Sequence, residues 1–328
     1  MKIKKLIARY NEVSNNFVGK ISSLSKIKYF LDFIGAYIVH GISFNDYFIY
    51  RFYTLNRRGR KEYITLRRTR KIQHFCNDNN ALQVFRDKIK FNHEYSELLG
   101  RKWLDVSASN QVDFDRFVSE NVGDRIFIKD VNGLCGIGVE CIETAKVDPL
   151  QLYKKLTSDN NARYLLEEPL KQSGPISEFH PWSVNTIRIT TVLDGDGENV
   201  NIMGAVLRMG TNQDYRDNLS AKGICAHIDI KTGIIFMPAF DKYNNSYIVH
   251  PDTGKQIVGF KIPDWEECKN FICRVAKRSP KVRYVGWDIV AKGDGTFLLI
   301  EGNDDGGYSL QQRNYKGQWD KYRKVLNI

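Results

Sequence analysis

The sequence predicts an α+β fold with mixed or antiparallel sheets. Up to about residue 100, apolar residues recur at three-to-four spacing, as at Ile27, Phe30, Leu31 and Ile34, which is typical of helices. From residue 183 onward, short apolar runs alternate with Gly-Asp-Gly and Thr-Gly turns, which is typical of strands. With 328 residues the chain can bury a large core, and we expect two or three subdomains.

The expected elements follow in chain order after the helical region. Asp264 is a candidate N-cap for the amphipathic segment that follows it. Pro169 ends the strand expected at 163–168. We expect strands at 125–129, 139–144, 163–168, 184–193, 200–208, 224–230 and 234–236, and helices at 149–157, 264–278 and 319–326.

One hairpin carries the most specific chemical prediction. Two apolar segments flank Asp294-Gly295, a dipeptide that favours a two-residue turn. Counting outward from that turn places Asp288 directly opposite Glu301, with their Cβ atoms about 5 Å apart on one sheet face. Asn303, two residues further along the strand, returns to the same face.

Two carboxylates held this closely repel each other unless a cation lies between them, and hard oxygen ligands suit Mg²⁺. The alternative is a tight turn that places two surface acids side by side. The neighbouring residues are apolar on both alternations, which indicates strands covered on both faces and favours the metal. We therefore predict a metal site at Asp288, Glu301 and Asn303.

The net charge of +11 is concentrated in residues 1–90. A basic cluster attracts nucleic acid, anionic lipid or a phosphorylated substrate, although a solvated basic face explains it equally well. No known nucleic-acid-binding pattern accompanies the charge, so a nucleic-acid partner is disfavoured. The cluster consists of Arg57, Arg58, Arg60, Lys61, Arg67, Arg68, Arg70 and Lys71.

Composition also bears on location. The six cysteines show neither a Cys-x-x-Cys pair nor a zinc spacing, and no apolar stretch follows the basic N-terminus, so we expect a reduced, cytoplasmic setting without a signal peptide. The most apolar window, 29–55, is too polar to span a membrane. Packing against the rest of the protein is the first expectation for it, and lying on a membrane surface is the alternative.

A glycine-rich loop follows the strand that ends at Lys129. Gly133, Gly136 and Gly138 would let backbone N–H groups approach a phosphate, and the lysine would add a positive charge. The loop is not a Walker motif, and a plain turn is the alternative. Arg188 and Arg208 stand among alternating apolar residues, where an arginine needs a carboxylate or a ligand phosphate as partner.

The order of these features resembles the ATP-grasp superfamily, in particular its sugar-transfer and polysaccharide branch. The resemblance runs from about residue 85 to 307, and its most specific stretches are 183–190, 217–224 and 286–303. It implies two α/β subdomains that grip ATP, at 85–170 and 171–328, after a basic helical region at 1–84.

The resemblance also implies roles for individual residues in binding the nucleotide. Lys88 and Lys129 would contact the phosphates while the loop 133–138 closes over them. The remaining nucleotide contacts would be an adenine hinge at Glu167, Glu168 and the backbone near Leu170, and a ribose contact at Glu178 or His180.

In the reaction that the resemblance implies, Arg188 and Arg208 would hold the γ-phosphate and the acyl phosphate, with two Mg²⁺ ions on the metal ligands. Lys222 stands where the branch has a glycine, as a substrate contact or merely a filled turn. The implied enzyme is an ATP-dependent carboxylate–amine ligase that joins an amino acid or amine to a sugar carboxylate, with a lipid-linked sugar or the inner membrane surface as partner. The alternatives are a kinase acting on a sugar hydroxyl and a nucleic-acid-binding protein.

Overall fold

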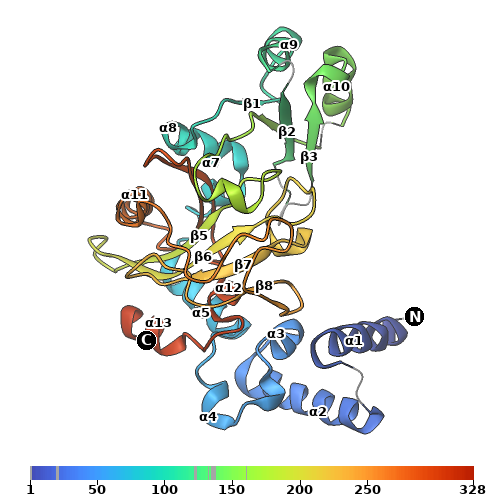
Figure 1. The fold of residues 1–328 in the computed structure, drawn as a ribbon, viewed down its shortest axis with the longest axis vertical. Helices are drawn as coiled ribbons and strands as arrows, with labels where there is room; N and C mark the ends of the chain where they lie inside the picture. The colour runs from blue at the N-terminus through green and yellow to red at the C-terminus, as the bar shows by residue number, and fades with distance from the viewer. Residues whose placement is uncertain (1, 20–21, 122–123, 132, 134–137, 160) are drawn as a thin grey trace.

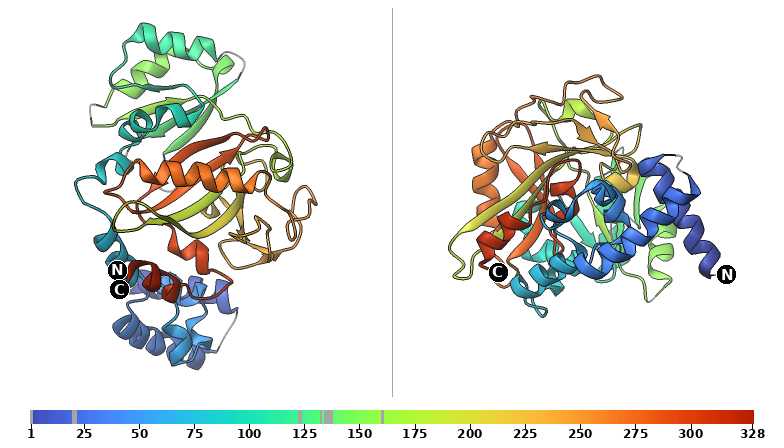
Figure 2. Two further views of the ribbon diagram at one scale, coloured as in Figure 1. Left: turned by 90° about the vertical axis from the view of Figure 1, so that its left-hand side faces the viewer. Right: turned by 90° about the horizontal axis from the view of Figure 1, so that it is seen from below.

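The molecule is α+β, as predicted, with two antiparallel sheets of four and seven strands (Figure 1). The computed structural model describes residues 2–328 except 20–21, 122–123, 132, 134–137 and 160. The four-stranded sheet and the first helices lie at opposite ends of the long axis, with the seven-stranded sheet between them (Figures 1 and 2).

The N-terminal region is helical and packs around aromatic rings. Phe33 contacts Phe44 and Tyr47 edge to face, with ring centroids 5.3 and 5.6 Å away, and the Arg60 guanidinium pairs with Asp32. The elements are α1 (Lys2–Val18), α2 (Ser23–His40), α3 (Phe44–Ile49), η1 (Phe52–Thr54), α4 (Arg57–Arg60) and α5 (Leu66–Cys76).

The small sheet has the strand order β1-β4-β2-β3 and is covered on one face by α9 and α10. Ile126, Ile128 and Leu166 point into that core, so Lys129 and Glu167, which alternate with them, lie on the other face. The elements are α6 (Gln83–Arg86), α7 (Lys88–Glu94), α8 (Ser96–Leu99), β1 (Trp103–Asp105), α9 (Gln111–Glu120), β2 (Arg125–Asp130), β3 (Val139–Glu143), η2 (Thr144–Lys146), α10 (Pro149–Thr157) and β4 (Tyr164–Glu167).

The large sheet has the order β11-β10-β5-β6-β7-β8-β9. Helix α11 packs on one face, and α5, α12 and α13 contact the other. The elements are η3 (Ser177–Phe179), β5 (Ile187–Leu193), β6 (Val200–Met209), η4 (Leu219–Ala221), β7 (Ile224–Ile228), β8 (Ala239–Phe240), β9 (Ser246–Tyr247), α11 (Trp265–Lys277), β10 (Tyr284–Ala291), β11 (Phe297–Asn303), α12 (Tyr308–Gln312) and α13 (Trp319–Leu326).

Most expected elements form, with two exceptions. Residues 234–236 make isolated bridges to Ile228 and Lys261 instead of a strand. Asp264 stands at the N-cap position of α11, as predicted, but its φ of 51° is left-handed and its side chain makes no capping hydrogen bond.

The metal hairpin has the predicted pairing, although its turn differs from the expected one. Asp288 lies opposite Glu301, as counted from the sequence. The loop has three residues, 293–295, because Lys292 N–H bonds to Thr296, and a β-bulge between Asp288 and Ile289 shifts the register back. The longer turn and the bulge compensate for each other.

The expected boundary at residue 84 does not coincide with a break in packing. Helix α5 shares a core with β10 and α13, in which Ile72 joins Tyr284 and Tyr322. The backbone of Ile64 exchanges two hydrogen bonds with the Gln312 side chain, at 2.7 and 2.9 Å. Residues 64–76 therefore pack as part of the large subdomain, and the three-part division remains a prediction.

Replacing Gly293 with Ala should destabilise the protein more than replacing Gly295. Both glycines have positive φ, 94° and 82°, so each alanine should cost about 1 kcal/mol from backbone conformation alone. At Gly293 the new Cβ would lie 2.5 Å from the Ser173 carbonyl oxygen, whereas at Gly295 the nearest atom is 3.8 Å away. We expect about 1–3 kcal/mol of additional loss for Gly293→Ala in urea unfolding. Equal losses would contradict the packing of this turn against Ser173.

Candidate active site

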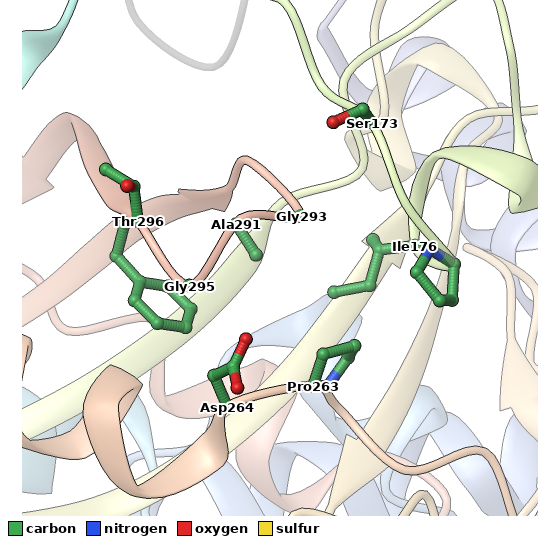
Figure 3. Close-up of a pocket in the computed structure, with 10 residues that line it drawn as sticks. Ser173, Ile176, Pro263, Asp264, Ala291, Gly293, Gly295 and Thr296 are labelled. Carbon is green, nitrogen blue, oxygen red and sulfur yellow. The ribbon is translucent and has the colours of Figure 1, made fainter.

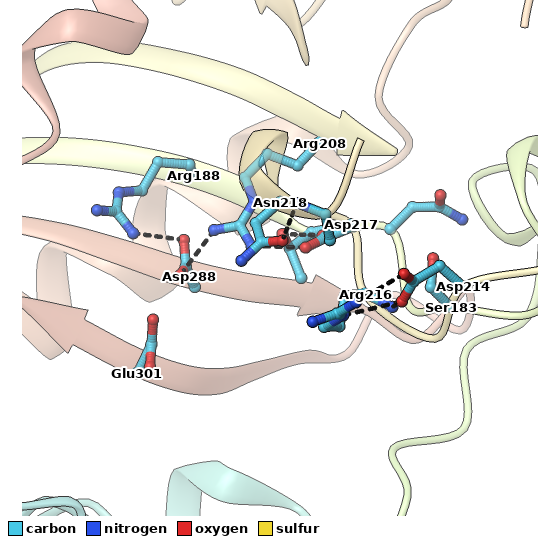
Figure 4. A network of polar contacts seen from close by, with 12 residues as sticks. Ser183, Arg188, Arg208, Asp214, Arg216, Asp217, Asn218, Asp288 and Glu301 are labelled. Atoms are coloured by element: carbon cyan, nitrogen blue, oxygen red, sulfur yellow. Dashed lines mark hydrogen bonds and ion pairs between the residues drawn. The ribbon is translucent and has the colours of Figure 1, made fainter. Parts of the chain in front are cut away.

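Four charged side chains gather on the face of the large sheet that points away from α11. On β5 and β10, Ile187, Ile189, Trp287 and Ile289 enter the core beneath α11. Side chains alternate along a strand, so Arg188 and Asp288 lie on the opposite face. Their companions on that face, from the neighbouring strands, are Arg208 and Glu301 (Figure 4).

Asp288 is the centre of an ion-pair chain. Its two carboxylate oxygens accept hydrogen bonds from Arg188 at 2.8 Å and Arg208 at 2.9 Å. The other side of the Arg208 guanidinium pairs with Asp217 at 2.5 Å, and Asp217 in turn accepts the Thr186 N–H at 3.0 Å. Burial would raise the pKa of Asp288, but the charges of the two arginines outweigh it and lower the pKa to about 2.

Both arginines retain an open donor. The Nε atoms of Arg188 and Arg208 are buried, yet neither has a hydrogen-bond partner among the described residues. A buried N–H without a partner is costly and uncommon in folded proteins. An anionic ligand on this face of the sheet would supply acceptors for these two donors.

Glu301 has the opposite electrostatic situation. Burial raises its pKa, and the neighbouring negative charge of Asp288 raises it further. Asn303 donates a long hydrogen bond to this carboxylate, with its Nδ2 3.2 Å from Oε1. Asp288 is bonded to two arginines, whereas among the described residues no lysine or arginine is bonded to Glu301, so a cation bound beside Glu301 would relieve the repulsion.

The donor set suits Mg²⁺. Two carboxylates and the Asn303 amide lie together on the hairpin, and all can offer hard oxygen ligands. Among the described residues no group of three or more His, Cys, Asp or Glu side chains could hold a metal. This set therefore fits a magnesium ion that takes its other ligands from phosphate oxygens and water, as is usual for nucleotide sites.

A second charged cluster comes from the small subdomain. Glu167 accepts hydrogen bonds from Lys129 at 2.5 Å, from Arg101 at 2.9 Å and from Asn92 at 3.0 Å. Burial would raise the pKa of Glu167, but Arg101 and Lys129 hold it well below its usual range. The cluster thus keeps its carboxylate ionised in a buried position.

Arg101 and two lysines connect this cluster to the metal hairpin. The Arg101 guanidinium also donates to the β11 carbonyls of Leu299 and Ile300, at 3.1 and 3.2 Å. Glu301 interacts electrostatically with both Lys88 and Lys129. The predicted phosphate-binding lysines and the predicted metal ligands therefore converge on one place from different subdomains.

The glycine-rich loop begins beside Lys88. The Lys88 ammonium donates to the carbonyls of Asp130 and Val131, at 2.9 and 3.2 Å, and to the carbonyl of Gly133. Gly138 has a φ of 76° and lies against Asp130, where a Cβ would come within 2.9 Å. Gly136 lies outside the described residues, so its predicted role remains a prediction.

The other predicted nucleotide contacts are placed less favourably for their roles. His180 is buried, with Ser183 and the Asn212 carbonyl 2.7 and 2.6 Å from its ring nitrogens, and Glu178 pairs with Lys255. Neither His180 nitrogen is open to a ribose hydroxyl while those bonds hold.

The hinge residues and Lys222 are placed as follows. The Glu167 carboxylate is bonded to Lys129, Arg101 and Asn92, so the predicted adenine hinge would consist of the backbone from β4 to Leu170. The Glu168 carboxylate accepts the Lys102 N–H at 3.0 Å. Lys222 has a left-handed φ of 71° after η4, which supports a filled turn. These residues' functional roles remain predictions.

Two described pockets lie apart from these clusters. The one at the tip of the metal hairpin is lined by Ser173, Ile176, Pro263, Gly293 and Phe297, and its volume of about 10 Å³ is too small for a nucleotide (Figure 3). The other, about 410 Å³, lies on the small subdomain beside Trp103 and Phe117. None of the predicted site residues lines either pocket.

Sequence reasoning did not assign roles to Arg101, Asn92 or Asp217. Asp217 stands in a stretch that carried the family resemblance, so its motif was visible but its bond to Arg208 was not. Arg101 and Asn92 had no signal, because only the fold brings them to Glu167, 66 and 75 residues away in sequence.

A family profile described as sugar-transfer associated ATP-grasp matches residues 67–326. The chain belongs to this family. The resemblance drawn from its motifs is confirmed, and the two sheets with the helical N-terminal region are the expected ATP-grasp fold. No curated protein matches the chain.

Several solved structures are similar at low identity. The ATP-grasp ligase PsnB with its minimal precursor is 14% identical over 77% of this chain and 60% of its own, with a TM-score of 0.42. The ADP complex of the N5-carboxyaminoimidazole ribonucleotide synthetase purK is 11% identical over 75% and 53%, with a TM-score of 0.46. An L-amino acid ligase from Bacillus licheniformis is 11% identical over 70% and 43%, with a TM-score of 0.42. The chain therefore spans about two-fifths to three-fifths of the length of these proteins.

Replacing each of two buried glutamates with Gln should change stability in opposite directions. The pKa of Glu301 is raised in the folded protein, so the contribution of this carboxyl to folding stability is greatest below its ordinary pKa of 4.5. That contribution is lost as the pH rises through the folded-state pKa. Glu301→Gln should therefore raise the melting temperature of the metal-free protein at pH 8. The lowered pKa of Glu167 means that its contribution is present above 4.5 and is lost as the pH falls. Glu167→Gln should destabilise by about 3–5 kcal/mol, because Arg101 and Lys129 lose their partner.

Thermal unfolding of both variants with EDTA at pH 8 measures the two signs. A lower melting temperature for Glu301→Gln would show that a cation of the protein already compensates that carboxylate, and would contradict the metal assignment.

Proposed function

We propose that the protein is an ATP-dependent carboxylate–amine ligase that works through an acyl phosphate. The observation that carries the proposal is the opposed pair of Asp288 and Glu301, in which only Asp288 is hydrogen-bonded to cations, with Lys88 and Lys129 close enough to act on Glu301. Among the described residues, Glu301 is a buried carboxylate with no bonded cation, and it lies near two lysines that could bind phosphate. This arrangement suits a nucleotide with a bound magnesium ion. Membership of an ATP-grasp family supports the same nucleotide.

The small subdomain would hold the triphosphate. Lys129 and Lys88 would contact its phosphates, and the backbone of residues 133–138 would close over them. Adenine would lie at the backbone after β4. Asp288, Glu301 and Asn303 would hold Mg²⁺, which neutralises phosphate charge when bound; two ions are expected from the resemblance.

The chemistry requires no protein nucleophile. An oxygen of the substrate carboxylate attacks the γ-phosphorus, the bond from that phosphorus to the bridging oxygen breaks, and ADP leaves. The amine nitrogen then attacks the acyl carbon, phosphate leaves, and the nitrogen loses a proton as the amide forms. The free Nε donors of Arg188 and Arg208 would bind the γ-phosphate and then the acyl phosphate.

The substrate class is the finer part of the proposal. The family is described as sugar-transfer associated, which supports a sugar-linked carboxylate or amine, such as a uronic acid joined to an amino acid in surface polysaccharide biosynthesis. Such a sugar would be offered in the cytoplasm, free or linked to a lipid. Lys222, on the turn after η4, remains a candidate contact for it.

Lys129→Ala should lower ATP turnover at least about 100-fold, because a charge that stabilises the transferring phosphate is lost. Lys292→Ala is the matched control, since Lys292 is partly exposed beside the hairpin turn and pairs only loosely with Asp294, at 3.7 Å. Steady-state ADP release measures both variants. Equal losses would show that overall basicity, rather than placement, controls nucleotide use.

A screen of uronic acids and amino acids for ADP release tests the reaction class. A ligase should release ADP fastest when carboxylate and amine are both present, and mass spectrometry should show the amide. ADP release with a sugar alone, together with a phosphorylated sugar hydroxyl, would instead identify a kinase and refute the ligase.

A further inference from the structure

Helix α2 presents an apolar face that the protein does not cover. Leu24, Ile27, Leu31, Ile34 and Ile38 follow one another at spacings of three and four residues, so they form one stripe along the helix. Leu24, Leu31 and Ile38 expose 82%, 62% and 64% of their surface. An amphipathic helix of a globular protein normally buries such a stripe.

The opposite side of α2 is already packed. Ala36 is buried, Phe33 contacts Phe44 and Tyr47, and Tyr29 contacts Tyr53 with centroids 5.0 Å apart. The helix therefore keeps its orientation on the aromatic core while its apolar stripe faces outward. Elsewhere the exposed apolar residues occur singly, as at Val112 and Leu150, or in pairs, as at Ile248 and Val249, which is ordinary for a protein surface.

The N-terminal region that contains this stripe is strongly positive. Residues 1–84 contain 16 lysines and arginines against five aspartates and glutamates, so their excess equals the whole net charge of +11. The remainder of the chain is neutral in balance. Lys28 borders the stripe, and the exposed bases nearby in sequence are Arg57, Arg58, Lys61, Arg70 and Lys71.

Part of the basic run predicted to serve a partner is used inside the protein. Arg67 caps α2 by donating to the carbonyls of Tyr37, Ile38 and Val39, and Arg60 pairs with Asp32. Arg68 donates to the carbonyl of Lys61 and lies over the Trp319 ring, 4.4 Å from its centroid. These three arginines are bonded within the protein, and the other bases, which are exposed, provide the positive charge of the surface.

We propose that α2 lies in the surface of an anionic lipid bilayer, with its apolar stripe among the acyl chains and the basic residues at the headgroups. A second copy of the chain would bring the same positive charge to the interface, and a nucleic acid would leave the apolar stripe exposed. In the described part of the chain no helix is long and apolar enough to cross a membrane, so α2 would lie in the plane of the surface.

The position of α2 agrees with this use. It lies at the end of the molecule opposite the small subdomain, with the seven-stranded sheet between them (Figures 1 and 2). A bilayer at that end would leave the small subdomain on the far side. The inference does not rest on the ligase reaction, and it holds for any chemistry at the site.

Flotation of the full chain with phosphatidylglycerol-containing vesicles tests the apolar stripe. The variant Leu24→Gln, Leu31→Gln, Ile38→Gln should bind such vesicles at least about tenfold more weakly, because three apolar anchors are lost. The control Val112→Gln, Leu150→Gln, Ile248→Gln changes three apolar residues that are also exposed, at 65%, 46% and 59%, and should bind as the unmodified protein does. Melting temperatures establish that both variants are folded.

The charge is tested in the same assay. Arg57→Gln with Arg58→Gln should weaken binding about fivefold per charge, whereas Lys154→Gln with Lys277→Gln, exposed bases outside the region, should not. Binding should also fall with added salt and be weaker on phosphatidylcholine alone.

Three outcomes would overturn the proposal. The first is an absence of vesicle binding by the full chain. The second is binding that the triple α2 variant does not reduce. The third is a dimer in solution that the triple variant dissociates, which would make the stripe an interface between copies of this chain.

Discussion

The site depends on an imbalance of charge between two neighbouring carboxylates. Asp288 and Glu301 are opposed across β10 and β11, and two arginines are bonded to Asp288. Those arginines lower the pKa of Asp288 and keep it ionised, and that negative charge helps to raise the pKa of Glu301. Among the described residues no cation is therefore bonded to Glu301, at the place where the metal ion of a bound nucleotide would supply one.

The same region joins the two sheets. Arg101 is bonded to Glu167 on β4 and to two carbonyls of β11, so one guanidinium links the small subdomain to the metal strand. Lys129 shares that glutamate and interacts with Glu301. Helix α5 packs against Tyr284 of β10 and so supports one strand of the hairpin. The side chains proposed to bind phosphate and metal are thus positioned by one connected set of buried bonds.

Features that depend on residues close together in the chain could be predicted from the sequence. The pairing of Asp288 with Glu301, the helices at 149–157 and 319–326, and the lysine that precedes the glycine loop follow from alternation and turn residues close in the chain. The hairpin shows the limit of such reasoning, because its three-residue turn packs against Ser173, which is distant in sequence, and its bulge had no signal in the residue pattern. Partners distant in sequence, such as Arg101 with Glu167 or Gln312 with Ile64, have no local signal. The bonds from Arg67 and Arg68 to backbone carbonyls likewise could not be predicted, because the same run of basic residues occurs whether its charges face solvent or cap a helix.

The most direct measurement of the central claim is anomalous diffraction from crystals grown with ADP and Mn²⁺ in place of Mg²⁺. We expect a manganese peak about 2.0–2.2 Å from oxygens of Glu301 and of Asp288 or Asn303, with phosphate oxygens completing its coordination. ADP bound with no anomalous peak at this hairpin, or a peak held by other residues, would contradict the account.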